Sequence, residues 1–151
     1  MEPFKTRVLA LILLACTAFA AIAQDGPQKL RAVTLTAGMH LVTAEVGRSQ
    51  GGRAIGLVHP KEMGGNEGML FVFEQPGVQC FWMKNTLLPL SIAFLADDGT
   101  VVNIADMKPQ SLDSHCSEKP VRFVLEMNQG WFAKRGIKAG FKLGGPGFAS
   151  R

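Results

Sequence analysis

The stretch 68–86, GMLFVFEQPGVQCFWMKNT, decides the fold of this chain, because it holds two apolar runs on either side of a turn. The first run, 69–73, is an unbroken series of apolar side chains that favour β structure, and such a series predicts a buried strand. The residues Gln75-Pro76-Gly77 after it are typical of a turn.

The second run, 80–86, also predicts a strand, because a proline on each side, Pro76 and Pro89, leaves too little room for a helix. The side chains of a strand alternate between its two faces. This alternation places Phe81, Met83 and Asn85 on one face, and Cys80, Trp82, Lys84 and Thr86 on the other.

The rest of the chain predicts more strands and few helices. The runs 30–36 and 39–46, separated by Ala37-Gly38, predict a hairpin, and so do 91–96 and 100–105, which flank Asp97-Asp98-Gly99. Residues 121–127 alternate like a strand, with Arg122, Val124 and Glu126 on one face. Short helices are predicted at 53–58 and at 129–135, the second capped by Asn128. The predicted fold is mainly β (α+β): an antiparallel sandwich or partial barrel with one or two short helices.

The same central stretch carries a family resemblance. GMLFVFE, FWMKNT followed by a proline and an aliphatic run, and a later strand that ends in LE together resemble the bacterial and archaeal family called domain of unknown function 192. The resemblance covers about 41–143 and implies a compact, mainly β domain that is often exported, with no established activity. The chain departs from the family at 58–65, where the pattern GLM, aromatic, Arg gives way to Val58-His59-Pro60. The role of the family arginine is therefore not carried over.

The N-terminal 23 residues have the pattern of a secretory signal peptide. Lys5 and Arg7 precede an apolar run, and Ala21-Ile22-Ala23 is a small-residue cleavage signal. The predicted organisation is a signal peptide at 1–23, a leader at 24–29, one domain at 30–143 and a flexible tail at 144–151, with no membrane span in the mature chain. An alternative is a lipoprotein anchored through Cys16. The predicted location is periplasmic or extracellular.

The charge of the mature chain argues against nucleic acid as a partner. The chain has 16 basic and 12 acidic side chains; without 1–23, which contains Glu2, Lys5 and Arg7, 14 and 11 remain and the net charge is +3. This basicity is weak, and the lysines and arginines form no cluster.

Cys80 and Cys116 remain after cleavage of the signal, and export favours a disulfide bond between them. The alternative is a metal or redox accessory protein that uses Cys116, His115 and nearby Met107. No C-x-x-C motif is present, and the three histidines have no metal-ligand spacing, so neither a metal site nor a cofactor is predicted.

The candidate site lies on the second run. Trp82 and Lys84 on one strand face can meet a planar, anionic or sugar-like ligand, and Asn85 and Thr86 add hydrogen-bonding groups. The family resemblance adds two carboxylates, Glu126 and Glu67. The competing interpretation is structural: a tryptophan that covers a second apolar layer and a lysine that faces solvent.

The sequence thus predicts an exported binding or accessory module of the periplasm or cell envelope, whose partner is a small polar or carbohydrate-like ligand or an envelope protein. An enzyme that uses Lys84 with Glu126 or Glu67 as an acid-base pair is the main alternative.

Overall fold

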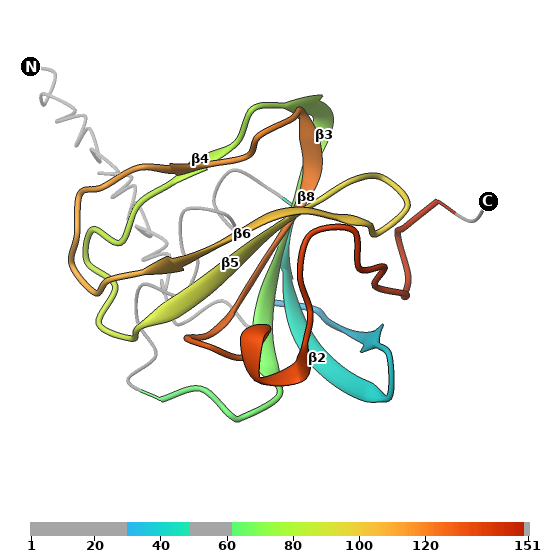
Figure 1. The fold of residues 1–151 in the computed structure, drawn as a ribbon, viewed down its shortest axis with the longest axis horizontal. Coiled ribbons are helices and arrows are strands. Elements are labelled where there is room, and N and C mark those ends of the chain that lie inside the picture. The colour runs from blue at the N-terminus through green and yellow to red at the C-terminus, as the bar shows by residue number, and fades with distance from the viewer. Residues whose placement is uncertain (1–29, 49–61, 150–151) are drawn as a thin grey trace, which may run out of the picture.

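The structure is a computed structural model that describes residues 30–48 and 62–149. Its main element is one six-stranded sheet, with a separate two-stranded ribbon beside it (Figure 1). The strands of the sheet, in spatial order, are β1 (Ala32–Ala37), β2 (His40–Gly47), β3 (Glu67–Gly77), β8 (Val121–Asn128), β5 (Leu90–Leu95) and β6 (Val101–Met107). The ribbon pairs β4 (Cys80–Phe81) with β7 (His115–Cys116).

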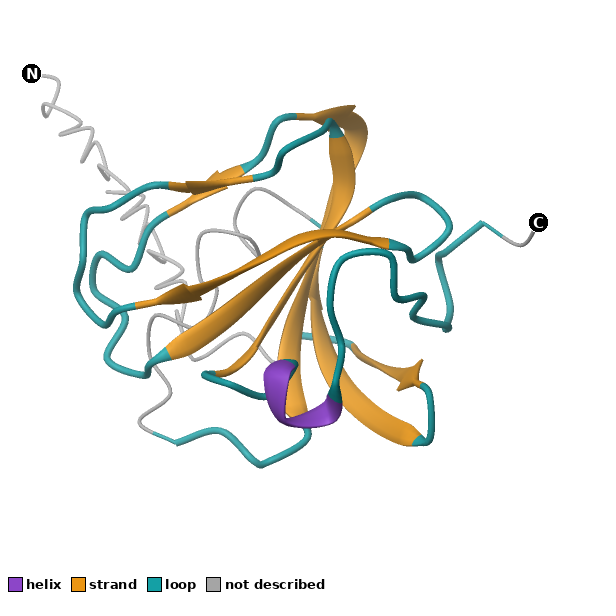
Figure 2. Cartoon of the chain, viewed as in Figure 1, coloured by secondary structure: helices purple, strands orange, loops and turns teal. Residues whose placement is uncertain are grey.

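The prediction of a mainly β fold is confirmed, and the structure adds the topology (Figure 2). The sheet is mixed, because β2 and β3 run parallel while every other neighbouring pair is antiparallel. It does not close into a barrel, since its end strands β1 and β6 do not pair with each other. Within residues 30–48 and 62–149, no helix is long and apolar enough to cross a membrane.

Both predicted hairpins are present. Gly38, with a φ of 62°, lies in the tight turn between β1 and β2, and Gly99, with a φ of 84°, lies in the turn between β5 and β6. Glycine adopts such angles without the steric cost that a Cβ atom brings. The Asp98 carboxylate accepts a hydrogen bond from the Thr100 N–H at 3.0 Å. Asp98 therefore has the local turn role that its sequence context indicates.

The central stretch differs from its prediction in two places. Strand β3 does not end before Gln75-Pro76-Gly77 but continues through it, with an irregular register against β8 between Val72 and Gly77. Pro76 is tolerated there because the regular ladder is already interrupted. The predicted strand at 80–86 is only two residues long, since the chain turns at Lys84 and Asn85.

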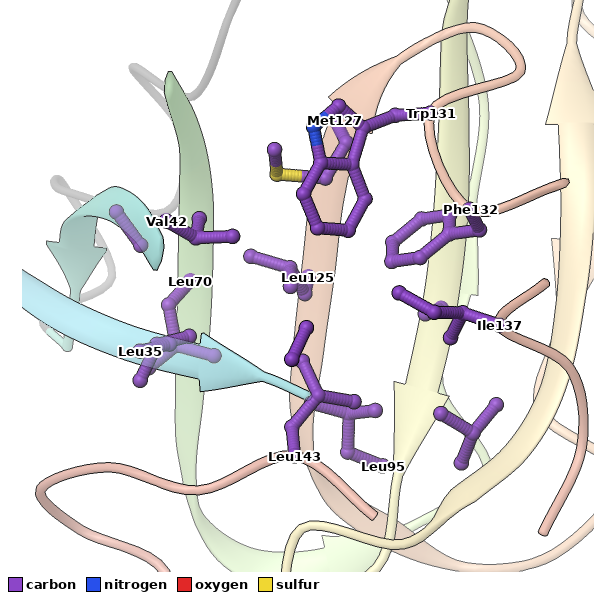
Figure 3. Close-up of a cluster of buried hydrophobic side chains, with 14 of the residues drawn as sticks. Leu35, Val42, Leu70, Leu95, Leu125, Met127, Trp131, Phe132, Ile137 and Leu143 are labelled. Atoms are coloured by element: carbon purple, nitrogen blue, oxygen red, sulfur yellow. The ribbon is translucent and has the colours of Figure 1, made fainter. Parts of the chain in front are cut away.

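The sheet is covered on both faces. One apolar cluster gathers Leu35, Leu70, Leu125 and Met127 under the segment that carries Trp131 and Ile137 (Figure 3). A second cluster gathers Met69, Phe71, Ile92 and Phe94 on the other face, with Met83 of the loop after β4 and Met107 at the end of β6. Burial of both faces explains why β5 is apolar at nearly every position instead of alternating.

The predicted helix at 129–135 shrinks to one 3-10 turn, η1 (Ala133–Arg135), which ends at Gly136 as expected. Asn128 does not cap it; its side-chain amide donates to the carbonyls of Met63 and Gly64 at 3.2 and 3.1 Å. The predicted helix at 53–58 and the signal peptide lie outside the described residues. In the segment 144–149, Phe148 packs edge-on against Phe123 at a centroid distance of 5.1 Å.

Candidate functional site

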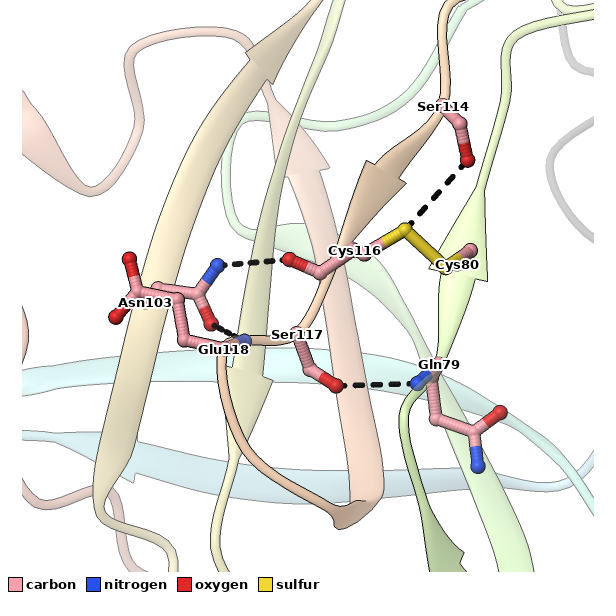
Figure 4. The surroundings of a disulfide bond; sticks show 7 residues. All are labelled: Gln79, Cys80, Asn103, Ser114, Cys116, Ser117 and Glu118. Carbon is pink, nitrogen blue, oxygen red and sulfur yellow. Dashed lines mark hydrogen bonds between the residues drawn. A yellow bond between two sulfur atoms is a disulfide. The ribbon is translucent and has the colours of Figure 1, made fainter.

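The disulfide-linked ribbon supports the loops that carry the predicted site. Cys80 and Cys116 face each other in the β4–β7 pair and form a disulfide bond (Figure 4). A further bond closes the ribbon next to the disulfide, where the Gln79 N–H donates to the Ser117 hydroxyl at 3.0 Å. The ribbon is joined to β6 of the main sheet by the Asn103 amide, which donates to the Cys116 carbonyl at 3.0 Å. The predicted pairing is present in the structure. A metal ligand at Cys116 would need a free thiolate, and the sulfur in the disulfide bond is not one.

Trp82 and Lys84 lie in the loop directly after β4, and their side chains are in contact. The indole is 58% exposed, and the Lys84 Nζ atom lies 5.6 Å from the centroid of the ring. This is a cation-π contact, which at an exposed site contributes about 0.5–1 kcal/mol. The structure therefore brings together the two residues that alternation had placed on one face, although it does so in a loop and not in a strand.

The two polar residues that follow have different environments. Asn85 is exposed at the turn and has a φ of 62°, a left-handed conformation that asparagine tolerates better than most residues. Thr86 is buried, and its backbone forms two hydrogen bonds. Its N–H donates to the Met83 carbonyl at 3.0 Å, and its carbonyl accepts from the Gln110 N–H at 3.1 Å. Asn85 is thus available to a partner, whereas Thr86 fixes the loop.

Two leucines are exposed on the loops next to Trp82 and Lys84 in sequence and by backbone pairing. The Met83 N–H donates to the Ser111 carbonyl at 3.0 Å, so the loop after β4 lies beside the loop before β7. Leu87 and Leu112, on these two loops, are 55% and 65% exposed. We call Trp82, Lys84, Leu87 and Leu112 the Trp82 patch. Exposed apolar residues grouped in this way are typical of interaction surfaces.

Glu126 lies in a different environment from this patch. In the sheet it stands between Met69 of β3 and Ile92 of β5, on the face of the second apolar cluster, and it is only 5% exposed. Burial raises the pKa of this carboxyl from its ordinary value of 4.5 to about 8. Sequence alternation placed Glu126 on the polar face of its strand, but the second cluster covers that face.

Glu67 is at the start of β3, and its carboxylate accepts a hydrogen bond from the Gly64 N–H at 2.9 Å. It lines a pocket of about 260 Å³ with Glu45 and Glu62. Sequence reasoning missed these two pocket residues. A signal for Glu45 was available, because in β2 it alternates with the apolar residues of the core face.

The structure does not gather the predicted carboxylates around the lysine. In the described part of the chain, Lys84 forms neither a hydrogen bond nor an ion pair with Glu126 or Glu67, and its neighbour is the Trp82 ring. The acid-base pair that the enzyme alternative requires is therefore not formed. What the arrangement offers is an exposed aromatic and aliphatic surface with one cation.

These features define the class: a small mainly β domain, stapled by one disulfide bond, with a mixed sheet covered on both faces and an exposed aromatic patch on its ribbon. The chain belongs to the DUF192 family, whose model, described as "Uncharacterized ACR", matches residues 33–145. The predicted family membership is confirmed.

The solved structures that are similar to this chain include two crystal structures. One is a proposed transcription regulator from Sinorhizobium meliloti 1021; it is 36% identical, with a TM-score of 0.71 over 77% of this chain and 93% of that one. The other is a protein of unknown function from Novosphingobium aromaticivorans DSM 12444, 38% identical, with a TM-score of 0.69 over 75% of this chain and 83% of that one. No curated protein matches the chain.

Proposed function

We propose that the protein is exported to the periplasm or cell envelope and acts there as a binding module that meets a protein partner through the Trp82 patch. Two observations support export. The first 23 residues have the order of basic, apolar and small residues that a signal peptide needs, and the Cys80–Cys116 bond is of a kind that persists in oxidising compartments. An anchor through Cys16 is the lipoprotein form of the same proposal.

The exposure of Trp82 is the observation that carries the binding proposal. A tryptophan that leaves more than half of its surface in water forgoes most of the stabilisation that its burial would bring. Tryptophan is also among the residues most enriched at the hot spots of protein interfaces, the few positions that contribute most of the binding energy. The disulfide bond and the backbone bonds between the two loops hold the patch in place, so little conformational entropy is lost on binding.

A protein partner fits this surface better than a sugar or a small polar ligand. Leu87 and Leu112, on the same pair of hydrogen-bonded loops as the indole, are exposed and aliphatic, whereas a sugar site gathers several hydrogen-bonding groups around the ring. The two pockets of about 450 and 260 Å³ found in the described part of the chain are lined by other residues. A patch with apolar residues and a lysine resembles the anchor and rim of a protein interface.

The role in transcription proposed for the Sinorhizobium protein applies to that protein. It is not extended to this chain, because the net charge of +3 after residue 23 is weak and unclustered.

Export is tested with a reporter that is active only outside the cytoplasm, fused after residue 29, and with the same fusion lacking 1–23. We expect activity from the first fusion alone. Equal activity of the two fusions would refute the export half of the proposal.

The patch is tested by photo-crosslinking in living cells. A photoreactive residue at Leu112 should give a discrete crosslinked protein that disappears in the Trp82→Ala variant. Met39, which is 89% exposed in the β1–β2 turn, is the matched control position and should give none. The same crosslinks from both positions, or a crosslink that survives Trp82→Ala, would contradict the proposal. A sugar that raises the melting temperature of the wild type but not of Trp82→Ala would replace the protein partner by a sugar ligand.

A further inference from the structure

Strand β6 forms one edge of the main sheet (Figure 1), and among residues 30–48 and 62–149 the backbone hydrogen bonds to this edge are confined to one end of it. At that end, the Val101 N–H donates to the Phe141 carbonyl and the Val101 carbonyl accepts from the Gly140 N–H, both at 2.8 Å. In the described part of the chain, the residues from Val102 to Met107 make no backbone hydrogen bonds outside the sheet. Most of the edge is therefore open.

The register shows which backbone groups are open. The Ala96 N–H donates to the Thr100 carbonyl at 2.8 Å, so the even-numbered residues of β5 direct their backbone groups toward β6. Their partners in β6 are Asn103 and Ala105, which therefore bond within the sheet. The N–H and C=O groups of Ile104 and Asp106 point away from the sheet, where another strand can bond to them.

A groove follows this open edge. It has a volume of about 450 Å³ and is lined by five consecutive strand residues, 102–106, including both residues with open backbone groups. The opposite wall comes from the segment around η1, with Phe132 and Ile137 as its buried apolar residues and Lys138 exposed at its rim. A groove with a strand edge and an apolar wall can bind an extended peptide by its backbone and by alternate side chains.

Of the charged residues that line the groove, two are acidic, Asp106 and Glu118, and one is basic, Lys138. The Asp106 carboxylate is held by the Ser91 hydroxyl, which in turn accepts a hydrogen bond from the Gly130 N–H at 2.8 Å. The backbone of Glu118 is held beside β6, because its N–H donates to the Asn103 side-chain oxygen at 3.0 Å. With two carboxylates against one ammonium group, Lys138, the groove favours a segment that carries basic side chains.

We propose that β6 binds an extended peptide segment of a partner protein as a seventh strand. The segment places an aliphatic side chain against Ile104 and Ile137 and a lysine or arginine beside Asp106 and Glu118. The groove shares no residue with the Trp82 patch, so this inference stands independently of the function proposed above.

The probe is a capped synthetic peptide of seven residues with valine, lysine and valine at positions two, four and six and threonine at the odd positions, so that valine and lysine lie on one face, as Ile104 and Asp106 do in β6. It is titrated into the oxidised mature protein and followed by amide NMR shifts. We expect the largest shifts at Ile104 and Asp106 and along the wall at Lys138. Methylation of alternate peptide nitrogens removes strand hydrogen bonds and should weaken binding about tenfold, and replacement of lysine by glutamate should weaken it similarly. No binding at about 1 mM, or equal binding of the methylated peptide, would overturn the proposal.

A protein variant provides the second arm of the test. Ile104→Pro removes an outward N–H without removing a bond of the ladder, so the fold should persist while peptide binding falls about tenfold. Thr34→Pro is the matched control: Thr36 of β1 bonds outward to Gly144, so the N–H of Thr34 also points out of the sheet, at the opposite edge. Full binding by Ile104→Pro, or equal loss in both variants, would refute the site. A dimer that Ile104→Pro dissociates would show that a second copy occupies the edge instead.

Discussion

Replacing Glu126 by glutamine should stabilise the domain in a pH-dependent way. The wild-type carboxyl lies between Met69 and Ile92 and is only 5% exposed, and its pKa rises from 4.5 to about 8 on burial. Glutamine has nearly the same shape as the protonated acid but never ionises. The folded wild type must either hold a proton on this carboxyl or bury its negative charge, and both lower the free energy of unfolding at neutral pH. The glutamine variant has neither cost, and the packing of β8 should be almost unchanged.

The sign of the effect follows from proton binding. Below pH 4.5 the carboxyl is protonated in both the folded and the unfolded chain, so the substitution changes little. Between pH 4.5 and about 8 the unfolded chain has lost this proton and the folded chain retains it, so the free energy of unfolding falls as pH rises. At about 1.4 kcal/mol per pH unit, the penalty is about 3 kcal/mol at pH 7 and levels off near 5 kcal/mol above pH 8.

The assay is urea unfolding of the wild type and of Glu126→Gln from about pH 4 to pH 9, at constant ionic strength. The difference in free energy of unfolding should grow from near zero to about 3 kcal/mol at pH 7. Glu45→Gln is the matched control, since Glu45 lies opposite Met69 in the same row across the sheet but is exposed; it should leave the wild-type pH dependence unchanged. A difference between Glu126→Gln and wild type that is constant over this pH range would refute the reasoning.

Three further predictions concern stability and the patch. The Cys80→Ser and Cys116→Ser double variant should lose about 4 kcal/mol in urea unfolding, because the bond closes a loop with a sequence separation of 36, and a reducing agent should destabilise the wild type equally. Gly68→Ala should cost about 2 kcal/mol or more, since its Cβ atom would lie 2.5 Å from a backbone oxygen of β8, while Gly65→Ala, with no atom within 4 Å of its Cβ, should cost under about 1 kcal/mol in the same assay. Trp82→Ala should change the free energy of unfolding by less than about 1 kcal/mol, because the indole is largely exposed, and a larger loss would assign the ring a structural role.

The sequence predicted those parts of the fold whose signals are local. Each hairpin is encoded by a turn motif with strands on either side, and Gly38 and Gly99 occupy the positive-φ positions that such turns require. The parallel pairing of β2 with β3 and the insertion of β8 between β3 and β5 have no local signal, because they join segments that are far apart along the chain. The strand continuing through Pro76 was missed for the same reason: its partner, β8, accommodates the irregularity.

The candidate site was predicted unevenly. Trp82 and Lys84 are close in sequence, so their contact depends on local geometry that a pattern can indicate. The position of Glu126 depends on what covers the sheet, and alternation within one strand says nothing about a second layer. The open groove along β6 was not predicted either, although Ser91 gives a signal for it as the one polar residue in an apolar strand.

The central position of β8 also determines when the domain can assemble. This strand is the last of the eight along the described part of the chain, yet it joins β1-β2-β3 to β5-β6. While the ribosome has delivered only the earlier strands, β3 and β5 each lack the neighbour that β8 provides, and unpaired strands of this kind promote aggregation. Completion of the fold is therefore a late event, and we expect the chain to depend on holding chaperones until β8, which ends at Asn128, can pair with β3 and β5.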